Sequence, residues 1–532
     1  MVTRHRRLVI PPETIFLMTP DQLARTLEDF LAAAQNAVIL EDNAALFDLA
    51  QAKYSISGEH NKCLLHVWSS ERNVVRRVLE AEVKNQTLRL AVQRLGQSRP
   101  SKLEICRQRD PRTLTAKRLT RLTYQRTLQR TLQRWFPSFQ ADPLRTSMDL
   151  ERSFGPIYCR GVLHQGQSAF AVLGVNAQEA QASIDAALTF AILWLDACRQ
   201  NQAEKFVVEG LKLFLPAGAA HLTRERMAHL NSQAAKWHLY ELDERDDTLR
   251  ELDASDCGNV ATRLVHSTDE SGTRSRFAAP IAQIQALMPE AEIAVLSPAE
   301  VAFRCHGLEF ARARLAHEPA SFRSTTEIVF GAGPQETLLC PANLARFMQL
   351  VCSIGEVRHP QGPRDHPLWR MHPERWLESL VIQNVAAVDE QLDPASFYSQ
   401  VPAFSAADRA MIDVLAVTRA GRLTVVELKA DEDIHLPLQG LDYWSRVAWH
   451  HARGEFQRFG YFPLRELSPA DPLLFLVAPA LHVHPSADTL LHYFSPQVHW
   501  ELLGIDERWR QGVKIVFRKR PLKNMLPHQH AA

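Results

Sequence analysis

The sequence predicts a multidomain α/β protein. Its 532 residues are enough for three or four domains of roughly 100–200 residues each. A content of 46% hydrophobic and 23% charged residues is typical of globular proteins that bury sizeable cores. Stretches with the alternating pattern of strands are interspersed with stretches that have the helical period. We therefore divide the chain into residues 1–106, 107–255, 256–360 and 361–532.

Composition excludes several classes of protein. Lys and Arg number 61 against 60 Asp and Glu, so any nucleic-acid affinity must come from local patches. The eight cysteines are scattered without a Cys-x-x-Cys pair, which indicates neither a zinc ribbon nor a disulfide framework. Pro11 and Pro12 interrupt the apolar N-terminal run, and the apolar run 186–195 is too short to span a membrane. We expect a cytoplasmic protein without a membrane partner.

Residues 1–106 predict a helix followed by a small antiparallel β domain. The helix begins near Pro20 and carries apolar residues at helical spacing. Strand-like runs joined by short polar turns follow from residue 53 to residue 106. Two roles are open for this segment, a plain docking domain or a nucleic-acid platform. The platform would use Arg76, Arg77, Arg89 and Arg94.

The most basic stretch of the chain is 102–134. Arg126, Arg130 and Arg134 recur every four residues on a predicted helix, so they share one face. Such a stripe neutralises phosphates without recognising sequence. The alternative is a solvated helix face that pairs with the acidic stretch 241–253. The residues predicted to bind nucleic acid here are Lys117, Arg118, Arg121, Arg126, Arg130 and Arg134.

Residues 412–429 predict a β-hairpin. Two apolar, β-branched runs flank a polar break, and a loop at 419–421 with Gly421 in the left-handed conformation would close it. This loop places Asp413 directly opposite Glu427 on one face, with Cβ atoms roughly 5 Å apart. Lys429 lies two residues farther along the same face.

Two facing carboxylates repel each other and are costly to desolvate. A bound Mg²⁺ would remove this conflict, because Mg²⁺ is usually held by one or two carboxylates together with waters and phosphates. Lys429 can orient a water or stabilise negative charge at the phosphate. The alternative is a salt-bridged strand pair in which Asp413 and Glu427 share Lys429.

The flanking helices add polar candidates. His372-Pro373 begins a helix in which Glu378 shares a face with apolar residues, so its carboxylate either caps a neighbour or points into a site. A second helix begins at Pro437. Its Gln439, Tyr443 and Arg446 form a polar stripe that would hold a phosphate backbone, or else an ordinary solvated face.

In this order, Glu378, Asp413, Glu427-Leu428-Lys429 and Gln439-x-x-x-Tyr443 resemble the PD-(D/E)XK nuclease superfamily. The spacing of Gln439 and Tyr443 is similar to that of the recombination-exonuclease branch. The gap between Asp413 and Glu427 is similar to that of the archaeal and actinobacterial mismatch-endonuclease branch. The resemblance covers roughly residues 370–515, and it departs from the family in that no proline precedes Asp413.

The resemblance implies a restriction-endonuclease-like domain over 361–532, with a mixed central sheet flanked by helices. It implies that Asp413, Glu427 and the Leu428 carbonyl hold Mg²⁺ or Mn²⁺, that Glu378 assists, and that Lys429 serves the attacking water. Gln439 and Tyr443 would then hold the nucleic-acid backbone.

Residues 135–255 echo this pattern. Gly166 divides two apolar runs as Gly421 does, and in both regions a helix and a strand ending in Pro-Ala follow. Aligning the glycines places Val172 and Gly174 where Glu427 and Lys429 stand, so this copy could not hold a metal in the same way. One interpretation is a degenerate second nuclease-like domain used for binding or dimer formation. The other is chance similarity, which a different sheet order would establish.

Residues 256–360 predict a mixed α/β connecting domain, and the prolines of 355–373 indicate a linker into the last domain. Together these features predict an Mg-dependent deoxyribonuclease, with DNA favoured over RNA and endonuclease favoured over exonuclease. Repair and defence against foreign DNA are both open, and a homodimer is compatible with the sequence. The alternative is a non-catalytic nucleic-acid-binding or assembly protein that retains a nuclease-like scaffold.

Overall fold

The computed structural model describes residues 18–521 apart from short segments. It is a mixed α/β structure, as the sequence predicts, and it divides into two compact units, Met1–Leu128 and Gln129–Ala532. The strands of the described residues form four sheets. The segments outside the description, besides the two ends of the chain, are 33, 35–36, 42–43, 50–51, 59–61, 69–72, 85–86, 95–99, 107–113, 149–153, 203–204, 257–259, 261, 318–323, 334 and 406–408.

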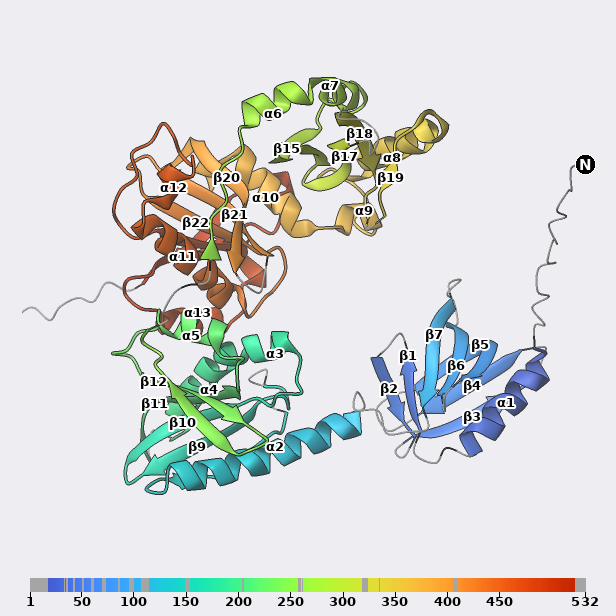
Figure 1. Ribbon diagram of the computed structural model, residues 1–532, viewed down its shortest axis with the longest axis vertical. Helices are drawn as coiled ribbons and strands as arrows, with labels where there is room; N and C mark the ends of the chain where they lie inside the picture. Colours follow the sequence, from blue (N-terminus) through green and yellow to red (C-terminus); the bar gives the residue numbers. More distant parts are fainter. Residues whose placement is uncertain are drawn as a thin grey trace, which may run out of the picture. The chain divides into compact units, whose positions relative to one another are not determined.

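The first unit contains an antiparallel sheet of order β2-β1-β7-β6-β5-β4-β3. Its strands are β1 (Val38–Glu41), β2 (Ala44–Asp48), β3 (Lys53–Ser57), β4 (Cys63–Trp68), β5 (Asn73–Lys84), β6 (Thr87–Arg94) and β7 (Pro100–Cys106). Helix α1 (Pro20–Ala32) packs across this sheet (Figure 1). Leu27 and Phe30 lie on the buried side of the helix, which is the side that their helical spacing predicts.

Arginines of this sheet are engaged in ion pairs within the sheet. Arg76 and Arg94 both contact the buried carboxylate of Glu41, and Arg89 lies 3.3 Å from Glu104. The hydrogen bond from Arg76 is the main cause that lowers the pKa of Glu41 to about 2, because it stabilises the ionised form. Arg76 therefore stabilises the fold through a buried ion pair, while the more exposed Arg89 and Arg94 leave both the docking and the nucleic-acid roles open.

The second unit contains two sheets that share one strand order. The first sheet has the order β13-β12-β11-β10-β9-β8. Its strands are β8 (Gln140–Ala141), β9 (Cys159–Gln165), β10 (Ser168–Gly174), β11 (Val207–Pro216), β12 (Lys236–Asp243) and β13 (Thr248–Leu252). The associated helices are α2 (Leu114–Trp135), which begins in the first unit, α3 (Gln181–Asp185), α4 (Ala187–Gln202) and α5 (His221–Met227).

The other sheet has the order β14-β20-β21-β22-β23-β24-β25. Its strands are β14 (Thr262–Arg263), β20 (Leu392–Ser405), β21 (Arg409–Thr418), β22 (Leu423–Leu428), β23 (Leu473–Pro479), β24 (His499–Ile505) and β25 (Ile515–Lys519). The associated helices are α10 (Pro373–Gln383), α11 (Leu436–Ala452), α12 (Glu455–Arg458) and α13 (Ala487–His492). Because β14 lies in this sheet, the predicted connecting segment 256–360 contributes a strand to the last domain.

Strands β9 to β13 match β21 to β25 in order and direction. In each set an antiparallel hairpin is followed by two parallel pairings and then an antiparallel edge strand. The sheet-order condition for an internal duplication is therefore met. We call residues 140–252 the first copy and residues 392–519 the second copy.

The strand register corrects the alignment of the copies by one residue. Gly174 pairs with Phe214, two residues before Pro216, and Leu428 pairs with Val477, two residues before Pro479. Gly174 is thus equivalent to Leu428. The expectation that Val172 and Gly174 stand at the places of Glu427 and Lys429 is wrong, and Leu173 and Val175 stand there instead.

The fourth sheet is an antiparallel meander between the two copies in sequence. Its strands are β15 (Glu292–Ser297), β16 (Glu300–Cys305), β17 (Leu308–His317), β18 (Ser324–Phe330) and β19 (Thr337–Leu338), and its helices are α6 (Glu270–Arg276), α7 (Ala278–Leu287) and α8 (Leu344–Val357). The predicted linker 355–373 is folded, and it includes α9 (Pro367–Arg370). The buried Arg358 organises it by donating hydrogen bonds to the carbonyls of Leu368, Met371 and His306.

Among the described residues, the helical stretch 181–201 is long and apolar enough, by length and composition, to cross a membrane. It corresponds to α3 and α4, and 56% of its apolar window is buried inside the protein. A core helix passes the same test, and Leu188, Ile192 and Leu195 of α4 belong to the core that the two copies share.

Candidate metal and nucleic-acid site

The hairpin β21–β22 has the predicted register. Val414 pairs with Val426 and Val417 pairs with Leu423, and the continuation of this register by one residue places Asp413 opposite Glu427. Gly421 adopts a φ of 83°, the left-handed conformation expected for the loop. A Cβ at this position would also lie 2.4 Å from the carbonyl oxygen of Glu466, so glycine is required twice over.

Glu427 lies at the centre of the site. Its side chain is 1% exposed, and Oε1 lies 3.2 Å from Nζ of the half-buried Lys429. Asp413 Oδ2 accepts a hydrogen bond of 3.0 Å from the Leu428 N–H. Oε2 of Glu427 has no hydrogen-bond partner among the residues that the structure describes. The salt-bridge alternative, in which Asp413 and Glu427 share Lys429, is therefore present only in part, because the Lys429 ion pair is to one oxygen of Glu427 and Asp413 accepts from the Leu428 N–H.

Glu378 reaches the site from α10. Pro373 occupies the first turn of this helix, and Trp376, Leu377 and Val381 bury its apolar face. Glu378 is 3% exposed, and its Oε2 accepts hydrogen bonds from Arg375 (2.9 Å) and other side chains. Oε1 of Glu378 has no partner among the described side chains and backbone groups. The carboxylate therefore points into the site, as the sequence allowed.

Gln400 connects Glu378 to Asp413. Its Nε2 donates a 2.8 Å hydrogen bond to Glu378 Oε2 and lies 3.5 Å from Asp413 Oδ1. Gln400 has a φ of 52° within β20, a left-handed conformation that costs a non-glycine residue about 1–2 kcal/mol. Strain of this kind tends to occur at functional sites.

Sequence reasoning missed both Gln400 and Arg375. The spacing of Arg375 and Glu378, three residues apart on one helix, is a signal that could have identified Arg375. Gln400 gives no comparable signal, because only the pairing of β20 with β21 brings it opposite Asp413.

Gln439 and Tyr443 lie on α11, which covers the same face of the sheet. Gly440 permits this close approach, since a Cβ there would lie 2.4 Å from a methyl group of Leu476. Gln439 hydrogen-bonds to Tyr443, and burial followed by the charge of Glu427 raises the pKa of the Tyr443 phenol. The phenol therefore stays neutral and keeps a proton to donate.

Arg446 differs from a surface arginine. It is 5% exposed, Tyr443 is buried beside it on α11, and Gln439 is half-buried. The polar stripe of this helix is therefore not a solvated face, and that alternative is wrong. The stripe faces the protein interior, where its donors are shielded from bulk water.

The three carboxyl groups are electrostatically strained. Burial, and then the charge of Asp413, raise the pKa of Glu427 well above its ordinary value. Burial also raises the pKa values of Asp413 and Glu378. Burial lowers the pKa of Lys429, but Glu427 and Asp413 outweigh this effect, so its net pKa is raised and it remains an ammonium. Negative charge in the site is thus only partly compensated.

The donor set suits a hard divalent cation. Among the described residues no group of three or more His, Cys, Asp or Glu side chains could hold a metal alone. Mg²⁺ does not require such a group, because it keeps several waters and accepts phosphate oxygens. Asp413, Glu427 and the unpartnered oxygen of Glu378 could supply hard ligands, although Lys429 and Arg375 already compensate part of their charge.

The predicted nucleic-acid residues of α2 lie mostly on its exposed side. Tyr124, Leu128 and Leu132 form the buried side of the helix. Lys117, Arg118, Arg126, Arg130 and Arg134 are exposed, and Arg121 is half-buried. Arg130 lies 3.3 Å from Asp247, so the pairing with 241–253 that was the alternative occurs at this position.

Glu427→Gln should stabilise the metal-free protein at high pH. A carboxyl whose pKa is raised by folding binds a proton that the unfolded chain has released, so stability falls as pH rises from about 4.3 through the raised pKa. The amide cannot ionise. From pH 5 to pH 8 in EDTA, we expect Tm to fall less for Glu427→Gln than for the wild type. Each kcal/mol of difference in the free energy of unfolding should appear as a difference of about 2–4 °C in Tm.

The matched control is Glu432→Gln, since Glu432 is exposed in the loop after the hairpin. It should retain the wild-type pH slope in calorimetry. Equal slopes for Glu427→Gln and the wild type would show that Glu427 is not under electrostatic strain.

Comparison with known proteins does not place the chain in a family. No family model matches it, and no curated protein or solved structure gives a significant match.

Proposed function

We propose that residues 361–532 form a restriction-endonuclease-like domain and that the chain is a metal-dependent nuclease. The observation that carries the proposal is the half-buried Asp413, which the strand register places opposite the buried Glu427 on one sheet face, with Lys429 3.2 Å from Glu427. A structural salt bridge would need one carboxylate, whereas this site gathers three and leaves oxygens of two without partners. Perturbed ionisable groups held together in this way are typical of functional sites.

Mg²⁺ or Mn²⁺ would be held by Asp413, Glu427 and the Leu428 carbonyl, with Glu378 assisting. When bound, the cation polarises the scissile phosphate and lowers the pKa of a water. The ammonium of Lys429 lies within hydrogen-bonding distance of Glu427, and from there it orients the attacking water. The chain would thereby contribute one ammonium group to the water and two or three carboxylates to the cation.

The remaining polar residues position the substrate and the carboxylates. The neutral hydroxyl of Tyr443, supported by Gln439, donates to a phosphate oxygen of the backbone. Arg375 and Gln400 hold Glu378, and Gln400 links it to Asp413. Gln400 is a positioning residue, because it acts through the carboxylates that bind the cation.

The substrate is a nucleic acid, and DNA is favoured over RNA by the resemblance of the motif. The exposed basic side of α2 provides phosphate contacts that do not depend on sequence. Internal cleavage in repair or in defence against foreign DNA is consistent with this arrangement. A non-catalytic scaffold that binds nucleic acid is the competing function, and the cleavage test separates the two.

Asp413→Ala and Lys429→Ala should each abolish cleavage. Loss of a cation ligand or of the group that orients water should lower kcat by at least about 10²-fold. The measurement is cleavage of plasmid and single-stranded DNA with Mg²⁺ or Mn²⁺. Asp431→Asn is the control, because this exposed carboxylate lies two residues beyond Lys429 and should retain the wild-type rate. Activity that survives both alanine substitutions would refute the site, and inactivity of the wild type on every nucleic acid would favour the scaffold.

Gln400→Gly should separate stability from cation binding. Glycine accepts the φ of 52° without strain, but the loss of the hydrogen bond to the buried Glu378 and the added freedom of the unfolded chain oppose this gain, so we expect Tm to change little. Loss of the side-chain amide frees Glu378 and Asp413, so Mn²⁺ affinity measured by calorimetry should fall about 10-fold. Unchanged Mn²⁺ affinity would remove Gln400 from the proposed positioning role.

Arg126→Ala combined with Arg134→Ala should weaken binding to duplexes of any sequence equally. Each arginine that contacts a phosphate adds about one unit to the slope of log K against log salt. The slope measured by fluorescence anisotropy should therefore fall by about two units. Arg346→Ala on α8 is an exposed control that should keep the slope. A double variant with the wild-type slope would contradict a role for α2 in phosphate binding.

A further inference from the structure

At five positions of the candidate site the first copy has a residue of different chemistry. Arg160 pairs with Leu173 across β9 and β10, and Asp413 lies opposite Glu427 in the register of β21 and β22. Val175 stands at the place of Lys429. The equivalences are Arg160 for Asp413, Leu173 for Glu427, Val175 for Lys429, Phe190 for Gln439 and Trp194 for Tyr443, the last two being the fourth and eighth residues of α4 and α11.

These side chains fill the space that the second copy keeps polar. The Arg160 guanidinium, 3% exposed, lies 4.5 Å from the Phe154 ring centre and 5.6 Å from that of Trp194. Trp194 Nε1 donates a 2.9 Å hydrogen bond to the Gly161 carbonyl. Leu173 is fully buried. A packed cation–aromatic cluster supplies no anionic ligand for a metal at these positions. We therefore call the first copy the silent copy, meaning that it has no metal ligands where the second copy has carboxylates.

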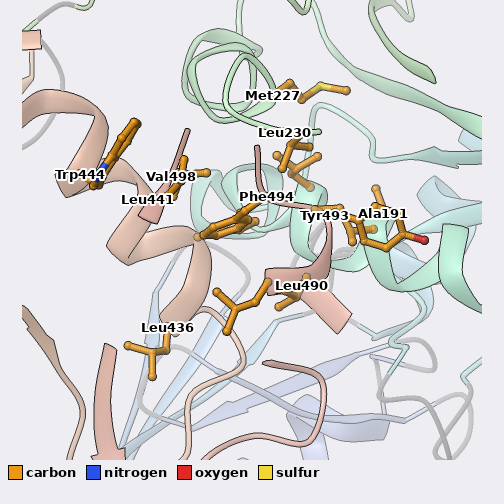
Figure 2. Packing of buried hydrophobic residues seen from close by; sticks show 14 of the residues in the cluster. Ala191, Met227, Leu230, Leu436, Leu441, Trp444, Leu490, Tyr493, Phe494 and Val498 are labelled. Carbon is orange, nitrogen blue, oxygen red and sulfur yellow. The ribbon is translucent and has the colours of Figure 1, made fainter. Parts of the chain in front are cut away.

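The two copies pack against each other crosswise. Helix α5 of the first copy contacts α11 of the second, and α13 of the second contacts α4 of the first. At the centre, Leu230 and Phe494 form an antiparallel bridge (Figure 2). The Asn231 N–H donates to the Tyr493 carbonyl and the Ser495 N–H donates to the His229 carbonyl, both at 2.8 Å. Equivalent segments thus meet each other as they do across a two-fold axis.

This contact is extensive and specific. Figure 2 shows Met227 and Leu230 near Tyr493 and Phe494, and all four belong to one hydrophobic core together with Trp444. Arg226 of the first copy makes a bidentate ion pair with Asp442 of the second, at 2.8 and 2.7 Å. An apolar centre flanked by a buried ion pair is the pattern of a permanent subunit interface.

We infer that the first copy takes the place of a second subunit, so that each chain presents one catalytic centre and cuts one strand of a duplex per binding event. The inference rests on the proposed nuclease function. The two strands of a duplex run in opposite directions, and a two-fold pair of sites is the simple way to cut both together. Here the partner position is already occupied by a copy without carboxylates.

The test uses the full chain and supercoiled plasmid with Mn²⁺. Nicked circles should accumulate almost completely before linear molecules appear, and light scattering of the protein on a short duplex should give the mass of one 60.3 kDa chain. Linear DNA formed in the same phase as nicked circles would overturn the inference. Absence of any cleavage would instead refute the proposed function, and the inference with it.

A mixing experiment distinguishes one centre from two. Wild-type chain is mixed with an equal amount of Asp413→Ala chain at constant total concentration. If each chain acts alone, the nicking rate should fall to half. If cutting needs two active chains paired together, linear product should fall to about a quarter, because only one pair in four then contains two active centres. The second result would assign the silent copy a purely structural role and overturn the single-centre inference.

Discussion

The mutual repulsion of two carboxylates on one buried sheet face is the constraint on which the rest of this region depends. The tight loop at Gly421 sets the register of β21 against β22. This register places Asp413 and Glu427 opposite each other on the same face of the sheet. Both faces of β22 are covered by apolar side chains, so the Glu427 carboxylate cannot turn into water, and Asp413 is half-buried beside it. Lys429 pairs with one oxygen of Glu427 and leaves the other without a partner among the described residues.

The surroundings increase this strain rather than relieve it. Helix α10 delivers a third carboxyl, Glu378, and Gln400 holds it near Asp413 through a left-handed backbone conformation. A left-handed glutamine and desolvated carboxyl groups of this kind tend to occur at functional sites. In the proposed function, the strain fixes the carboxylates in place before the cation binds.

Local patterns determined what the sequence could predict. The alternating pattern of apolar residues and one glycine predict the hairpin and its centre, and the structure has the predicted register. The same pattern predicts that Asp413, Glu427 and Lys429 share a face, and Lys429 contacts Glu427 in the structure. Long-range pairing could not be predicted, so Gln400 was missed and the copies were aligned one residue out of register. Burial of Arg446 was missed for a related reason, since a polar stripe at helical spacing gives no indication of whether it faces solvent or a sheet.

The two copies show how one scaffold separates function from stability. At the place of Asp413 the first copy has Arg160 stacked on aromatic rings, and at the place of Glu427 it has the fully buried Leu173. A buried leucine at the position equivalent to Glu427 makes a favourable apolar contact instead of burying a charge. The first copy can therefore anchor the shared core, including the Arg226–Asp442 ion pair, and the second copy can carry the electrostatic strain.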